Sequence, residues 1–313
     1  MIYIQLGNVK KGIHYLKLAA EQRIVAAQFN LGVLYLTGTH VSLDINKAID
    51  YLTKAANAND SESRYLLGII YYSGYLIPTD IKKGIYFILL SSKYGNRSAN
   101  FAEGVLHHEG RYVKQDIEKA ILFYKEASSF NNYLAKNNLG IIYKLGFCDK
   151  ILANSANEIV FFEEAIRHSN DNVAMYNMAN ILIYDTKNDI NKPIQLLIKS
   201  MNHFKHSFVL LRMFLVKIFG FNLEAIKEET MKMNVSSDLQ SKICQNIVKM
   251  KLNDIFVLNE LYESFRKKVF LYGIGNEAIE YSVFSNSDKK NDLKNSKLRD
   301  ISSEFYIGFG FDM

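Results

Sequence analysis

The sequence predicts an all-α protein, a right-handed superhelical solenoid built from antiparallel helix pairs. Three observations predict it. A set of leucine, glycine and aromatic positions recurs every 36 residues, only 2 prolines and 17 glycines occur in 313 residues, and 49% of the residues are hydrophobic. Proline and glycine disfavour helix most strongly, so their scarcity favours helix throughout. A fixed period of this length is typical of a stacked repeat architecture.

The first half of each predicted repeat carries a leucine-glycine pair, an aromatic residue three positions later and a second glycine after three more. In the four copies these positions hold Leu31, Gly32, Tyr35 and Gly38; Leu67, Gly68, Tyr71 and Gly74; Gly104, His107 and Gly110; and Leu139, Gly140, Tyr143 and Gly146. The first glycine lies within a helix, where it costs about 1 kcal/mol relative to alanine. We therefore expect a partner helix to approach closely there. We expect the second glycine to end the helix in a left-handed conformation.

The second half of each repeat recurs at the same spacing. Its positions hold Asp44, Lys47, Ala48, Tyr51, Ala55 and Ala56, then Asp80, Lys83, Gly84, Phe87, Ser91 and Ser92, then Asp116, Lys119, Ala120, Phe123, Ala127 and Ser128. The aspartates precede the expected second helices and suit the N-cap position. Each repeat is thus predicted to be two antiparallel helices joined by a short loop.

Residues 27–56 resemble the Sel-1-like repeat, a branch of the tetratricopeptide superfamily. The repeat has the pattern A-x-x-x-L-G-x-x-Y-x-x-G, followed by D-x-x-K-A-x-x-(aromatic)-x-x-x-A-A. The resemblance is clear over residues 8–146 and continues in degraded form to about residue 205, where Pro193 stands in an alanine slot. Such a proline is tolerated in the first turn of a helix. The resemblance implies a scaffold or adaptor that binds other proteins.

The repeat spacing also predicts the organisation of the chain. The solenoid is expected over residues 1–235, followed by a pair of helices over 236–272, the second from Asn253 to Tyr272, and a polar, mostly disordered tail over 273–313. Its parts are a half repeat at 1–26, clear repeats at 27–62, 63–98, 99–134 and 135–172, and eroded repeats over 173–235. The half repeat lacks its first helix, so the chain is expected either to be a fragment or to dock its exposed second helix on something.

Helical geometry predicts one further stripe on the first helices, distinct from the core stripe. Proteins with the resembled repeat present these helices on the concave side, which implies a groove for a partner. The expected partner-binding residues are Phe29, Val33, Leu36, Tyr65, Ile69, Tyr72, Phe101, Val105, His108, Asn137 and Lys144. Lys136 and Lys144 would favour an acidic end of the partner. The alternative is that the aromatic residues of this stripe pack on neighbouring helices.

Composition disfavours several other classes of protein. The net charge is +6, but lysine supplies 30 of the 38 cations, whereas nucleic-acid readers favour arginine. Cys148 and Cys244 stand apart, as expected of reduced thiols. The first residues do not resemble a signal peptide, and the longest apolar stretch, residues 208–221, is too short to span a bilayer. We therefore expect a cytoplasmic protein that neither inserts into a membrane nor binds nucleic acid.

The sequence shows no catalytic motif. The adjacent His107 and His108 point in different directions on a helix, and the pair His203 and His206 has no third ligand nearby. We do not expect the chain to be an enzyme. We also do not expect it to bind a metal, a cofactor or a small-molecule substrate. The predicted function is a scaffold that binds a peptide or protein in its groove. Two alternatives remain: the docking arm of a larger enzyme or ubiquitin-ligase assembly whose catalytic part lies outside this chain, and a nucleic-acid binder.

Overall fold

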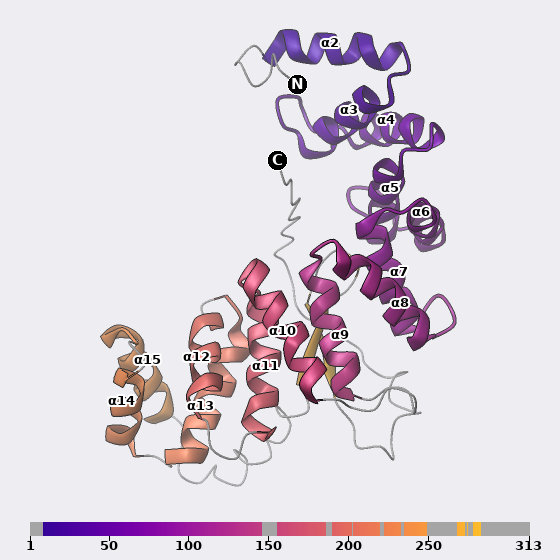
Figure 1. The fold of residues 1–313 in the computed structure, drawn as a ribbon. Helices are drawn as coiled ribbons and strands as arrows, with labels where there is room; N and C mark the ends of the chain where they lie inside the picture. Colours follow the sequence, from indigo (N-terminus) through magenta and orange to yellow (C-terminus); the bar gives the residue numbers. More distant parts are fainter. Residues whose placement is uncertain are drawn as a thin grey trace. The chain divides into compact units, whose positions relative to one another are not determined.

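The structure is a computed structural model, and it describes residues 9–145, 155–185, 190–201, 203–219, 222–232, 235–248, 268–272, 274 and 278–282 (Figure 1). The chain divides into two compact units, Met1–Phe130 and Asn131–Met313. The first unit is helical over its described residues. The residues of the second unit that the structure describes are helical apart from one β-hairpin, so the predicted helical fold class is confirmed.

The first unit contains helices of equal length. They are α2 (Val9–Glu21), α3 (Val25–Thr37), α4 (Ile45–Asn57), α5 (Ser61–Ser73), α6 (Ile81–Lys93), α7 (Arg97–Glu109) and α8 (Ile117–Ser129), each of 13 residues. The pairs α3/α4, α5/α6 and α7/α8 are the expected repeats, and α2 packs against α3 as the second helix of the half repeat. Leu31, Leu52 and Leu67 are fully buried between the helices.

The helix ends in this unit are formed as the sequence predicts. The carboxylates of Asp44, Asp80 and Asp116 each accept a hydrogen bond of 3.0 Å from the backbone N–H three residues later. These bonds cap α4, α6 and α8. The expected end glycines, Gly38, Gly74 and Gly110, have φ values of 69°, 70° and 66°. Such angles are strained for residues with a Cβ atom, so the glycines end the first helices at little conformational cost. Gly146, the fourth such glycine, lies outside the described residues.

A second row of capping residues, not predicted from the sequence, lies at the start of the first helices. Asp60, Asn96 and Asn132 stand 36 residues apart, and their side-chain oxygens accept hydrogen bonds of 2.7, 2.9 and 3.0 Å from the backbone N–H three residues later. Ile24 holds the corresponding position before α3 and makes no side-chain cap. The row was missed because its residue type changes from copy to copy, although each type is a good N-cap.

Replacing Asp60 by alanine is expected to lower the free energy of unfolding by about 1 kcal/mol, because the N–H of Ser63 loses its acceptor. Asp60→Ser keeps a capping oxygen, so it is expected to lower the free energy of unfolding by only about a few tenths of a kcal/mol. Urea denaturation of both variants measures the difference. Equal loss in the serine and alanine variants would show that the cap does not stabilise α5.

The helical glycines lie where the two helices of a repeat meet. A Cβ atom added to Gly32, Gly68 or Gly104 would come within 2.7 Å of a side-chain atom of Leu52, Ile88 or Tyr124, respectively. Real Cβ atoms almost never come that close to another heavy atom. The predicted close approach of the partner helix is therefore confirmed in all three repeats of the first unit.

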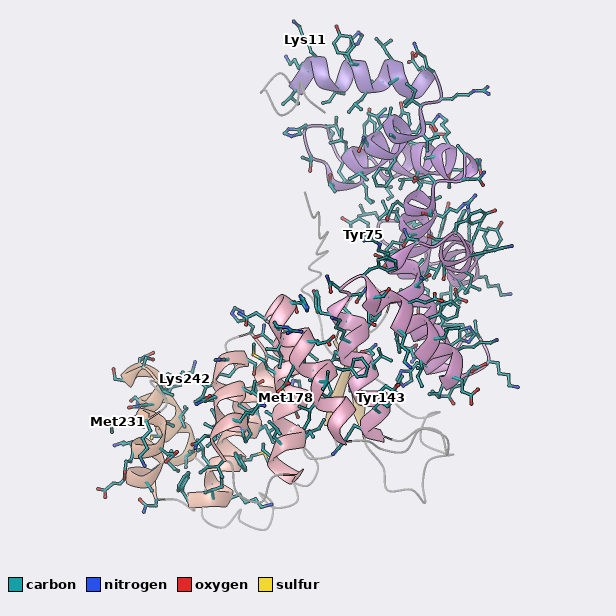
Figure 2. The ribbon with its side chains drawn as sticks, in the orientation of Figure 1. Lys11, Tyr75, Tyr143, Met178, Met231 and Lys242 are labelled. Carbon is teal, nitrogen blue, oxygen red and sulfur yellow. The ribbon has the colours of Figure 1, made fainter. Side chains whose placement is uncertain are left out.

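The second unit continues the helix pairs. Its elements are α9 (Tyr133–Leu145), α10 (Ser155–Ser169), α11 (Asn172–Asp185), α12 (Asn191–Ser200), α13 (Lys205–Phe219), α14 (Leu223–Lys232), α15 (Ser237–Val248), β1 (Lys268–Tyr272) and β2 (Ala278–Ser282). Gly140 meets Phe162 as its counterparts meet theirs, with 2.8 Å between an added Cβ and Cζ. Met178, labelled in Figure 2, is buried with Ile141 and Phe162 in the apolar core of α9, α10 and α11. Pro193 lies in the first turn of α12, as expected.

The hairpin is a correction to the predicted helix Asn253–Tyr272 and to the predicted tail. Residues 268–272 form β1, which pairs antiparallel with β2 from Lys268↔Ser282 to Tyr272↔Ala278. Strand forms here because Val269, Phe270 and Tyr272 are strong strand formers, and a second such run follows a connection that contains two glycines. The remaining expectations for residues 249–267 and 283–313 lie outside the described residues.

Candidate protein-binding surface

The predicted stripe on the first helices is only partly exposed. Phe29 and Val33 on α3, and Tyr65, Ile69 and Tyr72 on α5, are each between buried and exposed. The ring of Tyr72 also makes an edge contact with that of Tyr112, with 6.1 Å between centroids. We call these five residues the α3/α5 surface; Phe29 and Tyr65, and Val33 and Ile69, occupy equivalent positions in two successive repeats, whereas the equivalent of Tyr72 is Leu36. Leu36, the sixth residue predicted on these helices, is buried with 5% of its surface exposed.

On α7 the predicted stripe lies in the interior. Phe101, Val105 and His108 are at most 4% exposed, so a partner cannot reach them in this conformation. The cause is Tyr124 of α8. Its ring lies 5.8 Å from that of Phe101, and its hydroxyl lies 3.4 Å from His108 Nδ1. Leu52 holds the position of Tyr124 in the first repeat. The larger ring of Tyr124 therefore fills the space beneath the stripe. On α7 the aromatic residue of the stripe packs on a neighbouring helix, as the alternative interpretation expected.

The partner-binding residues predicted on α9 differ in their exposure. Asn137 is fully buried, whereas Lys144 is partly exposed. Lys136 is only 5% exposed, and its ammonium group lies 2.9 Å from the carboxylate of Glu164. The charge of Lys136 is therefore used within the unit, which corrects the expectation that it attracts an acidic partner.

The first unit also contains aromatic pairs that join the two helices of each repeat. The rings of Tyr35 and Tyr51, of Tyr71 and Phe87, and of His107 and Phe123 stack with centroids 5.9 to 6.0 Å apart and nearly parallel planes. Tyr143 and Phe161 repeat the stack in the second unit at 5.5 Å. The constant spacing of 16 residues in the first three pairs was the sequence signal for this contact. In the first unit the pairs are structural, since the backbone carbonyls of Tyr35, Tyr71 and His107 accept the hydrogen bonds that close the loops at Asp44, Asp80 and Asp116.

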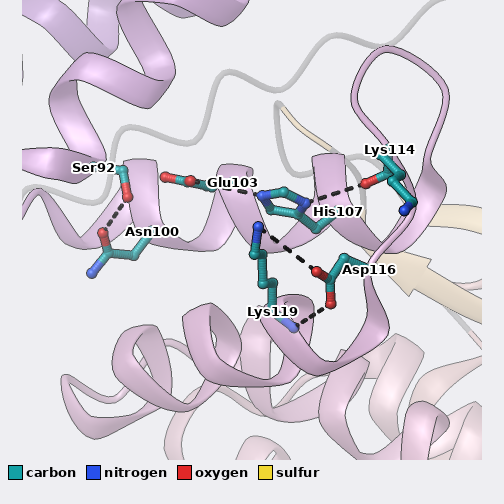
Figure 3. Close-up of polar contacts among 7 residues, drawn as sticks. All are labelled: Ser92, Asn100, Glu103, His107, Lys114, Asp116 and Lys119. Carbon is teal, nitrogen blue, oxygen red and sulfur yellow. Dashed lines mark hydrogen bonds and ion pairs between the residues drawn. The ribbon is translucent and has the colours of Figure 1, made fainter. Parts of the chain in front are cut away.

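His107 therefore occupies the position that a tyrosine holds in the other repeats, as the sequence predicts. Figure 3 shows its ring beside Glu103, with 3.8 Å between Nε2 and the carboxylate, while Nδ1 lies 3.4 Å from the carbonyl oxygen of Lys114. Burial raises the pKa of Glu103. Within the described ranges, no group of three or more histidine, cysteine, aspartate or glutamate residues could hold a metal ion.

A buried polar row, also missed from the sequence, connects consecutive repeats. Gln28, Arg64, Asn100 and Lys136 stand 36 residues apart and are each 5 to 6% exposed. Gln28 and Arg64 donate to the carbonyl oxygens of Ala20 and Ala56, eight residues earlier, at 3.2 and 3.1 Å. Asn100 accepts a bond of 2.7 Å from the hydroxyl of Ser92, also eight residues earlier (Figure 3). In the first unit, these side chains pair polar groups where one repeat follows another, so their role is structural.

None of the helices in the described part of the chain is long and apolar enough to cross a membrane.

Comparison with known proteins agrees with this geometry. The family model described as Sel1 repeat matches residues 5–23, 25–60, 61–95 and 98–129. A search of curated proteins found no match. A Sel1 repeat protein from Oxalobacter formigenes is similar in structure, with 20% identity, a TM-score of 0.61, and coverage of 77% of this chain and 96% of that one.

A second similar structure is c5321, a protective antigen of uropathogenic Escherichia coli strains that displays an SLR fold. It shares 22% identity, with a TM-score of 0.59 over 72% of this chain and 49% of that one. The chain thus spans about half the length of the E. coli protein. At these identities, the two likenesses show the fold. The Sel1 repeat model thus matches four segments between residues 5 and 129, and the two structures show that the fold is similar to the SLR fold.

Proposed function

We propose that the chain is a protein-interaction scaffold whose α3/α5 surface binds a partner protein or peptide. Sel1 repeat proteins are in general scaffolds of this kind. The observation that carries the proposal is the recurrence of partly exposed apolar side chains at equivalent positions of α3 and α5. Val33 and Ile69 are one such pair, and Phe29 and Tyr65 are another.

The energy of such binding comes chiefly from covering apolar area. Removing apolar surface from water contributes about 25 cal/mol per Å², and a few central aromatic anchors usually supply most of it. Tyr65 and Tyr72 are the aromatic candidates on α5. The edge contact of Tyr72 with Tyr112 restricts the Tyr72 ring, which lowers the entropy that this ring loses on binding.

Site-specific crosslinking tests the location of the surface. A photoreactive residue at Ile69 is expected to crosslink the partner, which mass spectrometry then identifies. The matched control places the same residue at Tyr86 on α6, which is 60% exposed on a second helix. Crosslinking from Tyr86 but not from Ile69 would place the partner on the second helices and contradict the proposal.

The double change Tyr65→Ala with Tyr72→Ala is expected to lower the affinity for that partner at least tenfold, because both anchors are lost. Titration calorimetry measures the affinity, and circular dichroism establishes that the helix content is unchanged. The control is Tyr86→Ala, which removes an exposed ring elsewhere in the same repeat. A folded double variant with wild-type affinity would show that these rings do not bind the partner.

A further inference from the structure

The β-hairpin lies against two first helices of the second unit. Strand β1 packs on α9 and α11, and Figure 1 shows the hairpin beside α9. Ile274, in the connection between the strands, is only 6% exposed. The hairpin is thus docked on the repeats, although a long stretch of sequence separates it from both helices. The predicted groove of these repeats is also formed by their first helices.

The same two helices carry a cluster of buried amide side chains. Asn137 and Asn138 on α9, and Asn177 and Asn180 on α11, are at most 2% exposed. The Nδ2 atom of Asn177 donates to Oδ1 of Asn137 at 2.9 Å, and Nδ2 of Asn137 donates to Oδ1 of Asn138 at 3.3 Å. We call these four residues the asparagine cluster.

Packing alone does not explain the asparagine cluster. A buried amide costs free energy unless its polar atoms are paired, so a packing face ordinarily carries apolar residues. At these two positions the preceding repeat has apolar residues, Phe101 and Ala102. The change from apolar to amide residues thus occurs on a helix against which a strand lies.

Amide side chains suit the recognition of an extended peptide. A carboxamide offers both a donor and an acceptor, as a peptide group does, and it can pair with a backbone of any sequence. Extended peptides gain affinity from such main-chain bonds and specificity from their side chains. The strand against α9 and α11 is rich in apolar residues, with Val269, Phe270 and Leu271 in its centre.

We propose that the face formed by α9 and α11 is a binding surface for an extended apolar peptide, and that strand β1 of the same chain, paired with β2, occupies it. An external peptide then binds only to molecules whose hairpin has left. Its apparent dissociation constant equals the intrinsic one divided by the fraction of such molecules. The surface is independent of the α3/α5 surface, so each proposal can fail without the other.

The test uses the full chain and a labelled synthetic peptide of residues 266–284. Leu271→Pro weakens the hairpin, because proline lacks the N–H and disfavours strand. Fluorescence anisotropy is expected to show at least tenfold tighter binding of the peptide to Leu271→Pro than to the wild type. Adding Asn177→Ala to Leu271→Pro is expected to abolish the gain. A peptide of scrambled sequence is the control. Equal binding to wild type and Leu271→Pro, or a gain that survives Asn177→Ala, overturns the proposal.

A second measurement decides the matter if Leu271→Pro fails to fold. The chain has no tryptophan, so Phe270→Trp provides a single reporter within β1. An excess of unlabelled peptide is expected to change the emission of this variant, because a displaced strand no longer packs on α9 and α11. The scrambled peptide is expected to leave the emission unchanged. An emission that does not respond to saturating peptide 266–284 overturns the proposal.

Discussion

Replacing Gly84 by alanine is expected to lower the free energy of unfolding by about 2 kcal/mol, although alanine is the better helix former. An added Cβ atom would lie 2.6 Å from the backbone nitrogen of Tyr72 and 2.8 Å from its Cα. Backbone atoms cannot rotate away as the end of a side chain can, so α5 and α6 would have to separate. The overpacking cost is therefore expected to exceed the gain of about 1 kcal/mol in helix propensity.

The two helices face each other through glycines. A Cβ atom added to Gly68 of α5 would lie 3.2 Å from the carbonyl oxygen of Gly84 on α6. In the neighbouring repeats, Ala48 and Ala120 hold the position of Gly84 and are fully buried. Those helix pairs accommodate a methyl group at this position, whereas the α5/α6 pair does not.

Chemical denaturation monitored by circular dichroism measures the effect of Gly84→Ala. Lys82→Ala is the matched control, because Lys82 is an exposed residue on the same helix and its loss is expected to change the stability by less than about 0.5 kcal/mol. A Gly84→Ala variant as stable as the wild type would show that α5 and α6 can separate at no cost.

The repeat itself could be predicted because its signals are local. A glycine that ends a helix, an aspartate that begins one and an apolar stripe between them act within a few residues, and each recurs at a constant spacing. The contact of the helical glycines could be predicted for the same reason. The close approach of Tyr72 to Gly84 was not predicted. In the sequence, Gly84 stands where the neighbouring repeats have alanine, and only the distance to Tyr72 shows that a methyl group does not fit there.

Exposure of the predicted stripe could not be derived from helical geometry. Phe29 and Phe101 hold the same position in their repeats, yet Phe29 is partly exposed and Phe101 is buried. The difference arises on the partner helix, where Tyr124 replaces the smaller Leu52 and fills the interior. A residue's exposure thus depends on the size of a side chain about 20 residues away. The sequence held this signal in the change from Leu52 and Ile88, which are equal in size, to the larger Tyr124.

The hairpin could not be predicted for a different reason. Its strands are short, they follow the last clear repeat by a long interval, and a two-stranded hairpin is marginally stable alone. In the structure β1 packs on α9 and α11, helices that lie far from it in the sequence. Val269, Phe270 and Tyr272 favour strand, but a run this short is also found in helices, so the preference did not by itself predict the hairpin.

Acidification from pH 6.5 to pH 4 is expected to remove about 3 kcal/mol of stability through His108 alone. Burial lowers the pKa of His108 from 6.5 to about 4. The unfolded chain therefore binds a proton near pH 6.5, whereas the folded chain does not bind one until about pH 4. The stabilising effect of the neutral imidazole is complete above pH 6.5 and is lost progressively as the pH falls through this window.

Two carboxyl groups on α7 change the stability in the opposite direction as the pH falls. Burial raises the pKa of Glu103 and of Glu109, so each takes up a proton more readily in the folded chain as the pH falls. The effect of His108 must therefore be measured as a difference between the wild type and a variant. His108→Leu is suitable because Leu36 holds the equivalent position in the first repeat and is buried there.

Urea denaturation of both proteins between pH 7 and pH 4 is the measurement. At pH 7 the variant is expected to be slightly less stable, since Tyr124 loses its contact with the imidazole. At pH 4 it is expected to be more stable than the wild type, because the unfolded variant has no histidine to protonate at this position. A constant difference between the wild type and His108→Leu across the range would show that the interior around Tyr124 admits a charged imidazole, and α7 would then be able to open toward solvent.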